Sequence, residues 1–211
     1  MQELLARGYQ VVRIGDPSGS PFDCPGVIDL APSPTRTELL ELWCLKRSRF
    51  LIASESGPYP FALLLGVPTL VVNVTGIAGI PPVRLGDLYL PKHVVETEAG
   101  RRLSLDDLLN ADYLINYRAV QGRYTYIENS EEELLEAVLE MEQGLRSARP
   151  ATVEQIEFDR RLRASMESEQ YRAWMASKHR PADYYIGRGR VAHIFAARYL
   201  PGTRAGERPR S

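Results

Sequence analysis

The sequence has few cysteines, no long apolar run and no excess of charge of either sign. Its two cysteines, Cys24 and Cys44, lie in unlike contexts, the first in a Pro/Gly-rich stretch and the second in an apolar helical stretch. This difference in context argues against a disulfide framework or a metal knuckle, so we expect two free thiols. No apolar run approaches the roughly 18 to 20 residues that a membrane span needs, and the N-terminus lacks the pattern of a signal peptide. We therefore expect a cytoplasmic protein without a membrane span.

The balance of charge excludes a general attraction to polyanions. The 211 residues include 26 Lys and Arg against 27 Asp and Glu, a formal net charge of -1. No global field would therefore draw the protein onto nucleic acid or an anionic membrane. The three histidines, His93, His179 and His193, are too scattered to form a metal site. We expect no nucleic-acid partner, no metal and no cofactor.

Strand-like and helix-like segments alternate through the first third of the chain. Residues 3–8 look like the end of a helix, which precedes four apolar β-rich runs. These runs lie at 9–14, 27–30, 49–53 and 68–74, and turns and two further helices, after Thr35 and at 58–65, lie between them. Alternation at this spacing is typical of right-handed crossovers in a parallel sheet. The strands lack polar alternation, as expected where helices cover both sheet faces. The pattern predicts an α/β protein with a Rossmann-like parallel sheet.

The second half of the chain is richer in helical patterns. We expect a strand at 87–95, a short helix at 104–109 capped by Ser104, and an amphipathic strand at 123–127. Ser130 with three following glutamates predicts a capping box and a helix to about residue 145. Further helices are predicted at 152–177 and 188–199. These assignments divide the chain into a Rossmann-like domain at 1–147, a helical extension at 148–200 and a flexible tail at 201–211.

The loop Ser54-Glu55-Ser56-Gly57-Pro58 is the first candidate site, because it joins an apolar strand to an apolar helix. Open α/β sheets bind ligands at loops that follow strands. Gly57 permits close approach, Pro58 suits a first helical turn, and a helix N-terminus attracts phosphate. The alternative is a strand-to-helix turn without a ligand.

The second candidate site consists of Arg13, Gly15 and Asp16, at the end of the first strand. A guanidinium at this edge of the sheet can hold a phosphate through two hydrogen bonds. The alternative is a solvated arginine beside an Asp-Pro turn. Neither loop matches G-x-G-x-x-G or the Walker motif, which disfavours a nicotinamide dehydrogenase and a P-loop NTPase.

The order of four segments along the chain is similar to that of a bacterial family of GT-B glycosyltransferases. These segments are VVRIGDPSG, VIDLA, RFLIASESGPYPFALLLGVPTLVVNVT and GDLYLPK, and most of residues 8–130 takes part. The SESGP turn also resembles the donor-site loop of heptosyltransferases and of UDP-N-acetylglucosamine epimerases. The resemblance implies a domain that binds a nucleoside-diphosphate sugar.

The same resemblance implies roles for individual residues. Ser56 and Gly57 would meet the diphosphate, Glu55 would lie near the sugar or the ribose, and Arg13 with Gly15 would line the nucleotide cleft. Asn73 and Lys92 are placed in the cleft as well. The expected substrate-binding set is Arg13, Gly15, Asp16, Ser54, Glu55, Ser56, Gly57, Pro58, Asn73 and Lys92.

The chain departs from the GT-B pattern in two respects. We expect the chain to lack the acceptor domain, which comes first in such enzymes and carries the usual catalytic base. Glu55 and Tyr59 stand where many relatives of the heptosyltransferase type carry Asp and His, so no catalytic residue is assigned. We therefore expect the donor-binding half of a glycosyltransferase in a shortened or split chain, which needs an acceptor-domain partner or self-associates. A non-catalytic nucleotide-sugar-binding or interaction module and a nucleotide-sugar epimerase are the alternatives.

Overall fold

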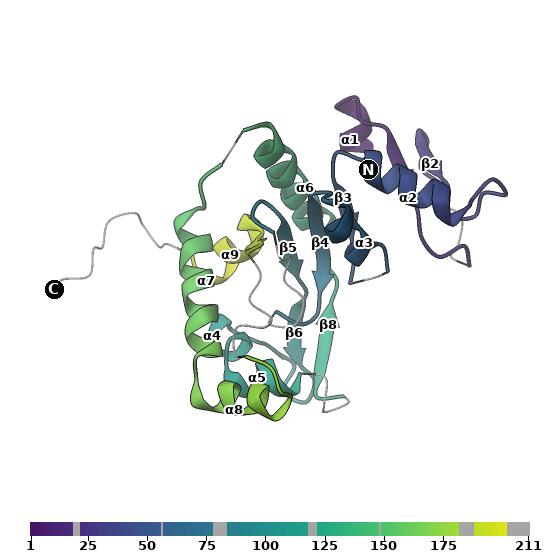
Figure 1. Cartoon of the computed structure of the whole chain (residues 1–211). Helices are drawn as coiled ribbons and strands as arrows, with labels where there is room; N and C mark the ends of the chain where they lie inside the picture. The colour runs from purple at the N-terminus through teal and green to yellow at the C-terminus, as the bar shows by residue number, and fades with distance from the viewer. Residues whose placement is uncertain are drawn as a thin grey trace. The chain divides into compact units, whose positions relative to one another are not determined.

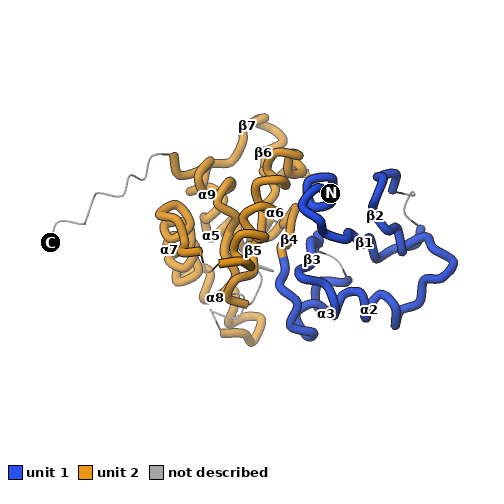
Figure 2. Tube along the Cα trace, turned by 90° about the horizontal axis from the view of Figure 1, so that it is seen from above, with its two compact units in different colours: residues 1–69 blue, residues 70–211 orange. Residues whose placement is uncertain are grey.

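The computed structural model describes residues 1–18, 22–55, 57–77, 84–117, 122–147, 149–181 and 188–201 (Figure 1). The chain divides into two compact units, Met1–Thr69 and Leu70–Ser211 (Figure 2), and each is described by itself. Within the described ranges, no helix combines the length and the apolar character that crossing a membrane requires.

Unit 1 contains short strands that alternate with helices. Its elements are α1 (Gln2–Ala6), β1 (Val11–Arg13), β2 (Val27–Asp29), α2 (Glu38–Arg47), β3 (Leu51–Ala53) and α3 (Pro58–Leu65). Strands β1 and β2 pair in parallel, and their register places Arg13 opposite Asp29 at the carboxyl ends of both strands. The predicted alternation of strands and helices is therefore confirmed for this unit.

Local side-chain chemistry sets the helix boundaries of unit 1. Helix α2 begins after Thr37, whose Oγ1 accepts a hydrogen bond from the Leu40 N–H at 3.1 Å. The predicted cap, Thr35, is wrong: Thr35 instead joins a turn in which its N–H donates to the Ser33 hydroxyl, and such local bonds compete with helix formation. Helix α3 has the predicted bounds and ends at Gly66, whose φ of 74° suits glycine.

A small apolar core holds unit 1 together. Leu45 of α2, Ala62 of α3 and Val67 are buried, and three partly buried side chains pack against them, namely Ile14, Leu51 and Leu65. Ile14 directly follows β1, and Leu51 opens β3. The chain segments that carry the two candidate loops therefore pack on one core. Both cysteines in this unit are free thiols, as predicted.

Unit 2 contains a parallel sheet flanked by helices. Strands β4 (Thr69–Val74), β5 (Leu88–Pro91) and β9 (Arg190–Val191) are neighbours in the order β4-β5-β9, and both pairs are parallel. Helix α6 (Glu131–Arg146) packs on β5, and α7 (Val153–Met166) packs on β9. The chain is thus an α/β protein with a parallel sheet, consistent with a Rossmann-like fold followed by C-terminal helices.

A second, antiparallel sheet in unit 2 was not predicted. It has the order β7-β6-β8 and consists of β7 (Arg101–Arg102), β6 (His93–Glu96) and β8 (Tyr124–Ile127). The predicted strand at 87–95 is in fact two strands, β5 and β6, which belong to different sheets and meet at Lys92. The predicted amphipathic strand at 123–127 is confirmed as β8, in which half-buried and exposed side chains alternate.

The helices of unit 2 largely follow their predicted caps. Ser104 and Ser130 form capping boxes that open α4 (Leu105–Leu108) and α6. The predicted helix at 152–177 is divided into α7 and α8 (Glu169–Ser177), because the Ser168 hydroxyl accepts the Tyr171 N–H and starts a new helix. The predicted helix at 188–199 contains β9 and then α9 (His193–Tyr199), which packs on α6 and α7. Helix α5 (Ala111–Asn116) was not predicted.

Candidate functional site

The carboxyl ends of β1 and β2 form the edge at which Arg13 was predicted to hold a phosphate. Arg13 Nη1 donates to Asp29 Oδ2 at 2.9 Å, and the two side chains are 22% and 17% exposed. The same carboxylate oxygen accepts the Phe22 N–H at 2.9 Å. The other oxygen, Oδ1, is buried and accepts no hydrogen bond from the described residues. Arg13 therefore lies at the predicted edge, beside an acidic partner that the sequence reasoning missed.

The loop after β1 is fixed by two further residues that were not predicted, Arg36 and Glu41. Glu41 accepts two hydrogen bonds from the Arg36 guanidinium, at 3.0 Å each, and one from the Gly15 N–H at 2.9 Å. Gly15 has a φ of 122°, a conformation that favours glycine. Arg36 precedes helix α2 and Glu41 lies in the first turn of that helix, so reasoning from strand ends did not reach them.

Asp16 takes part in a local turn at this edge. Its Oδ1 accepts the Ser18 N–H at 2.8 Å. This hydrogen bond is the main cause that lowers the pKa of the Asp16 carboxyl, and the nearby charge of Arg36 adds to it. Asp16 is therefore a charged, exposed turn residue next to Arg36.

The second loop leads from β3 into α3. Ser54 is exposed and Glu55 is half-buried, whereas Ser56 lies outside the described residues. Gly57 is the N-cap of α3, Pro58 is its first residue, and among the described residues no side chain caps this helix. A Cβ on Gly57 would meet nothing within 4 Å, so the space around the helix start is open.

The first turn of α3 nevertheless has few hydrogen-bond donors. Pro58 and Pro60 carry no N–H, so Gly57 and Tyr59 supply the amides of this turn. A phosphate at this end would therefore depend on two amides, the helix dipole and a cation from elsewhere.

Asn73 and Lys92 belong to unit 2, and both contact neighbours there. Asn73 Oδ1 accepts the Asn129 N–H at 2.7 Å, and Asn129 Oδ1 accepts the Asn73 N–H at 2.8 Å. Asn73 has a φ of 55° and lies where the β4–β5 register shifts. Lys92 Nζ donates to Glu128 Oε1 at 2.6 Å. These contacts join β4, β5 and the segment after β8.

A buried polar network in unit 2 involves His93. This side chain is 3% exposed, its Nε2 lies 2.6 Å from Glu133 Oε1, and its Nδ1 lies 3.1 Å from the Tyr199 hydroxyl. Arg198 pairs with the same Glu133 oxygen at 2.6 Å. Burial raises the pKa of Glu133, but hydrogen bonds from the Ser130 N–H and His93 outweigh it and lower the pKa overall. The network attaches α9 to β6 and α6.

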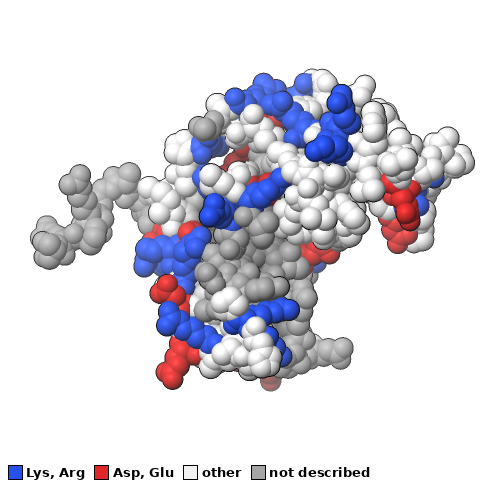
Figure 3. Space-filling view, in the orientation of Figure 1, with Lys and Arg blue, Asp and Glu red and all other residues white. Residues whose placement is uncertain are grey.

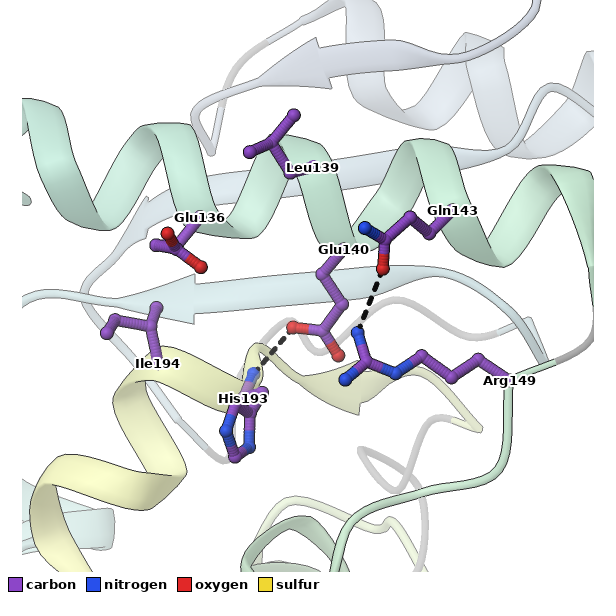
Figure 4. A pocket seen from close by; sticks show the side chains of 7 residues that line it. All are labelled: Glu136, Leu139, Glu140, Gln143, Arg149, His193 and Ile194. Atoms are coloured by element: carbon purple, nitrogen blue, oxygen red, sulfur yellow. Dashed lines mark hydrogen bonds between the residues drawn. The ribbon is translucent and has the colours of Figure 1, made fainter.

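A pocket of about 250 Å³ lies between α6 and α9 (Figure 4). Its lining residues are Glu136, Leu139, Glu140, Gln143, Arg149, His193 and Ile194. Glu140 Oε2 accepts the His193 N–H at 2.7 Å, and its Oε1 accepts Gln155 Nε2 at 2.7 Å. The carboxylate in this pocket therefore joins three helices, α6, α7 and α9.

The described residues present basic side chains in separate surface groups and contain no cluster that could bind a metal ion. On the face of the molecule in Figure 3, basic side chains lie in several separate groups rather than in one continuous band. Within the described ranges, no three His, Cys, Asp or Glu residues are grouped so that they could hold a metal ion.

The fold and the edge of β1 and β2 define an α/β protein with charged side chains at the carboxyl ends of parallel strands. Comparison of the chain with protein-family models, with curated proteins and with solved structures found no match. Function is therefore inferred from the residues of the site itself.

Proposed function

We propose that the chain binds a nucleoside-diphosphate sugar and is the donor-binding half of a GT-B glycosyltransferase. The observation that carries the proposal is the ion pair of Arg13 and Asp29 at the carboxyl ends of β1 and β2, followed by the turn that contains Asp16. Open α/β sheets bind nucleotides at this end of their strands. The resemblance of the SESGP loop to donor-site loops supports the same assignment.

The residues of unit 1 have distinct roles in this proposal. The Arg13 guanidinium and the amide of Gly57 at the start of α3 contact the diphosphate. During transfer, the bond between the anomeric carbon and the diphosphate oxygen breaks, and a new bond forms to an acceptor hydroxyl oxygen. The nucleoside diphosphate leaves with the electron pair, and nearby cations and amides stabilise its growing charge. The acceptor proton goes to a base in the acceptor half.

Exposed apolar side chains in unit 1 support a requirement for a partner. Val12 and Ile28 are register partners in β1 and β2, and both are exposed. Parallel strands are normally covered on both faces. Leu39 and Trp43, one helical turn apart on α2, are 78% and 60% exposed. A separate acceptor-domain chain or a second copy of this chain would cover such a surface.

Calorimetric titration with UDP, GDP, ADP and their sugar conjugates tests the proposal. Gly57→Trp places a large side chain in the open space before α3 and is expected to abolish binding. Gly144→Trp is the matched control, because a Cβ on Gly144 of α6 also meets nothing within 4 Å. Saturable binding that Gly57→Trp removes and Gly144→Trp preserves is the expected result. A folded wild-type chain that binds none of these ligands would refute the proposal.

A non-catalytic interaction module is the second candidate function. Lys92 pairs with Glu128, and Asn73 pairs with Asn129. Two of the residues predicted to bind the nucleotide sugar therefore already have partners within the protein, and this observation favours the interaction module. This alternative requires partner association without saturable nucleotide binding. The same titration therefore separates the two functions.

A further inference from the structure

The pocket between α6 and α9 carries charged side chains of both signs (Figure 4). We propose that it binds a small zwitterion of the aliphatic amino-acid class, with the ammonium group against Glu136 and Glu140 and the carboxylate against Arg149. The inference goes beyond the proposed function, because the described residues that line this pocket belong to unit 2, whereas both candidate nucleotide loops belong to unit 1.

The acidic side of the pocket comes from α6. Glu136 and Glu140 are one helical turn apart and line the same pocket; Glu136 is exposed, and Glu140 is 9% exposed. Glu140 accepts its two hydrogen bonds from neutral amides, the His193 N–H and Gln155 Nε2, at 2.7 Å each. Among the described residues, neither carboxylate forms an ion pair. Like charges one turn apart repel each other, so a cation bound against both carboxylates would relieve this repulsion.

Arg149 supplies the basic side of the pocket. Its Nη1 donates to Gln143 Oε1 at 3.2 Å, and this partner carries no charge. A guanidinium has five N–H donors, so it can also bind an anionic group. Figure 4 shows Arg149 and Glu140 in the space between α6 and α9, and in the described part of the chain they are not paired with each other. A ligand with neighbouring ammonium and carboxylate groups matches these two opposite charges.

The apolar surface and the size of the pocket limit the ligand further. Leu139 and Ile194 are partly buried and form the apolar part of the lining. The volume of about 250 Å³ is below the roughly 300–1,000 Å³ of pockets for drug-sized molecules, so the pocket suits a ligand smaller than a nucleotide sugar. Its acidic side suits an ammonium group rather than a metal ion, since no three metal-ligating side chains are grouped within the described ranges.

Calorimetric titration with L-leucine and two analogues tests the inference. L-Leucine has both charges and a branched aliphatic side chain. 3-Methylbutylamine keeps the ammonium group without the carboxylate, and 4-methylpentanoate keeps the carboxylate without the ammonium group. In the wild-type chain, L-leucine should bind saturably and each analogue about tenfold more weakly, because each analogue loses one charge-assisted interaction.

Two substitutions separate the two charges of the ligand. Arg149→Gln should weaken L-leucine about tenfold and leave 3-methylbutylamine unchanged. Glu136→Gln should weaken L-leucine and 3-methylbutylamine about two- to fivefold, since Glu140 remains, and should leave 4-methylpentanoate unchanged. Glu132→Gln is the matched control, because Glu132 is an exposed carboxylate one turn earlier on α6 that is not part of the lining. This control should bind all three probes as the wild type does.

The wild-type titrations decide even without the variants. Absence of saturable L-leucine binding to the folded chain would overturn the inference, and so would equal affinity for all three probes. An L-leucine affinity that neither Arg149→Gln nor Glu136→Gln changes would place the ligand elsewhere and overturn it as well. The proposed function is tested separately by the nucleotide titrations, which concern other ligands and the loops of unit 1, so the failure of one does not imply the failure of the other.

Discussion

Arg13 lies beside Asp29 because the parallel register of β1 and β2 pairs these positions, and the ion pair orients the guanidinium at the carboxyl edge. A guanidinium has five N–H donors, so pairing through Nη1 is compatible with a role toward phosphate. The nucleotide account therefore depends on Arg13 as a donor and on Asp29 as its partner.

Arg13→Gln is expected to weaken binding of a nucleoside diphosphate about tenfold to a hundredfold, because a charge-assisted hydrogen bond to phosphate is lost. Calorimetric titration measures the change. Arg7→Gln is the control, since Arg7 pairs with Glu3 on α1, away from the edge of the strands. Equal affinity of the Arg13 variant and the wild type would exclude a phosphate contact.

Asn73 combines a positive φ of 55° with a hydrogen bond from the Asn129 N–H. Asn73→Ala and Asn73→Gly both lose this hydrogen bond, but only alanine meets the steric cost of left-handed backbone. Asn73→Ala is therefore expected to lower the free energy of unfolding by about 1–2 kcal/mol more than Asn73→Gly. Urea denaturation measures both values. If the two variants are equally stable, the backbone at Asn73 is not strained.

Among the individual residues, sequence reasoning located Arg13, Gly15 and Asp16 at the end of a strand, because strand ends and turn residues are local features. It missed Asp29 and Glu41, since the register of β1 with β2 and the packing of α2 arise from tertiary structure. Pro58 and Pro60 can be read directly from the sequence. Because neither has a backbone N–H, the start of α3 offers fewer amide donors than a helix start usually does.

At the scale of elements, the helix caps contribute most clearly to stability. Ser130→Ala removes the hydroxyl that accepts the Glu133 N–H, and is expected to cost about 0.5–2 kcal/mol of unfolding free energy. Ser104→Ala removes the same kind of cap from α4, which has four residues, so its effect should be smaller. Thermal and urea unfolding of both variants give the comparison. A larger loss from Ser104→Ala would contradict this ranking.

The exposed cap of α4 predicts a dependence of stability on pH. Hydrogen bonds from Arg101, and then from the Ser104 N–H and hydroxyl, lower the pKa of Asp107 from its ordinary 3.8 to about 2. A lowered pKa in the folded state gives a contribution that is present above the ordinary pKa and is lost as the pH falls through the folded value.

Asp107→Asn should therefore show a shallower loss of unfolding free energy between pH of about 4 and about 2 than the wild type. Urea denaturation over this range measures the slopes. Asp106→Asn, at the neighbouring and more exposed position, is the control. Identical slopes for the Asp107 variant and the wild type would refute the contribution.

The elements themselves were largely predictable where their signals are local. Helix α3 and the start of α6 have the predicted bounds because Pro58 and the Ser130 capping box are sequence signals. The division of 87–95 into β5 and β6 was not predictable, since a continuous β-rich run does not reveal that its halves pair in different sheets. Likewise, β9 is a strand because β5 offers it a partner.

At the scale of the whole molecule, unit 1 exposes the apolar side chains of Leu39 and Trp43 on one side of α2. We expect the wild-type chain to self-associate, so that its average mass in light scattering rises with concentration. Trp43→Lys should reduce this rise, whereas Ile156→Lys, at an exposed apolar position on α7, should not. A wild-type chain that stays monomeric at all concentrations would contradict the expectation.

The α/β class was predictable from alternating apolar strands and helices, because that pattern reflects burial along the whole chain. The division into units at residues 69 and 70 was not, since it depends on which segments pack together. The boundary predicted at 147 stays a prediction, and β9 shows that a segment beyond it returns to the parallel sheet.

The most direct test of the account is to follow the backbone amide signals of the glycines by NMR while UDP, GDP or ADP is added. Gly15 and Gly57 lie at the two candidate loops, whereas Gly100 and Gly144 lie elsewhere in the chain. The account predicts that the signals of Gly15 and Gly57 shift together and saturate at one ligand concentration. Shifts confined to Gly100 and Gly144, or no shift in a folded chain, would contradict it.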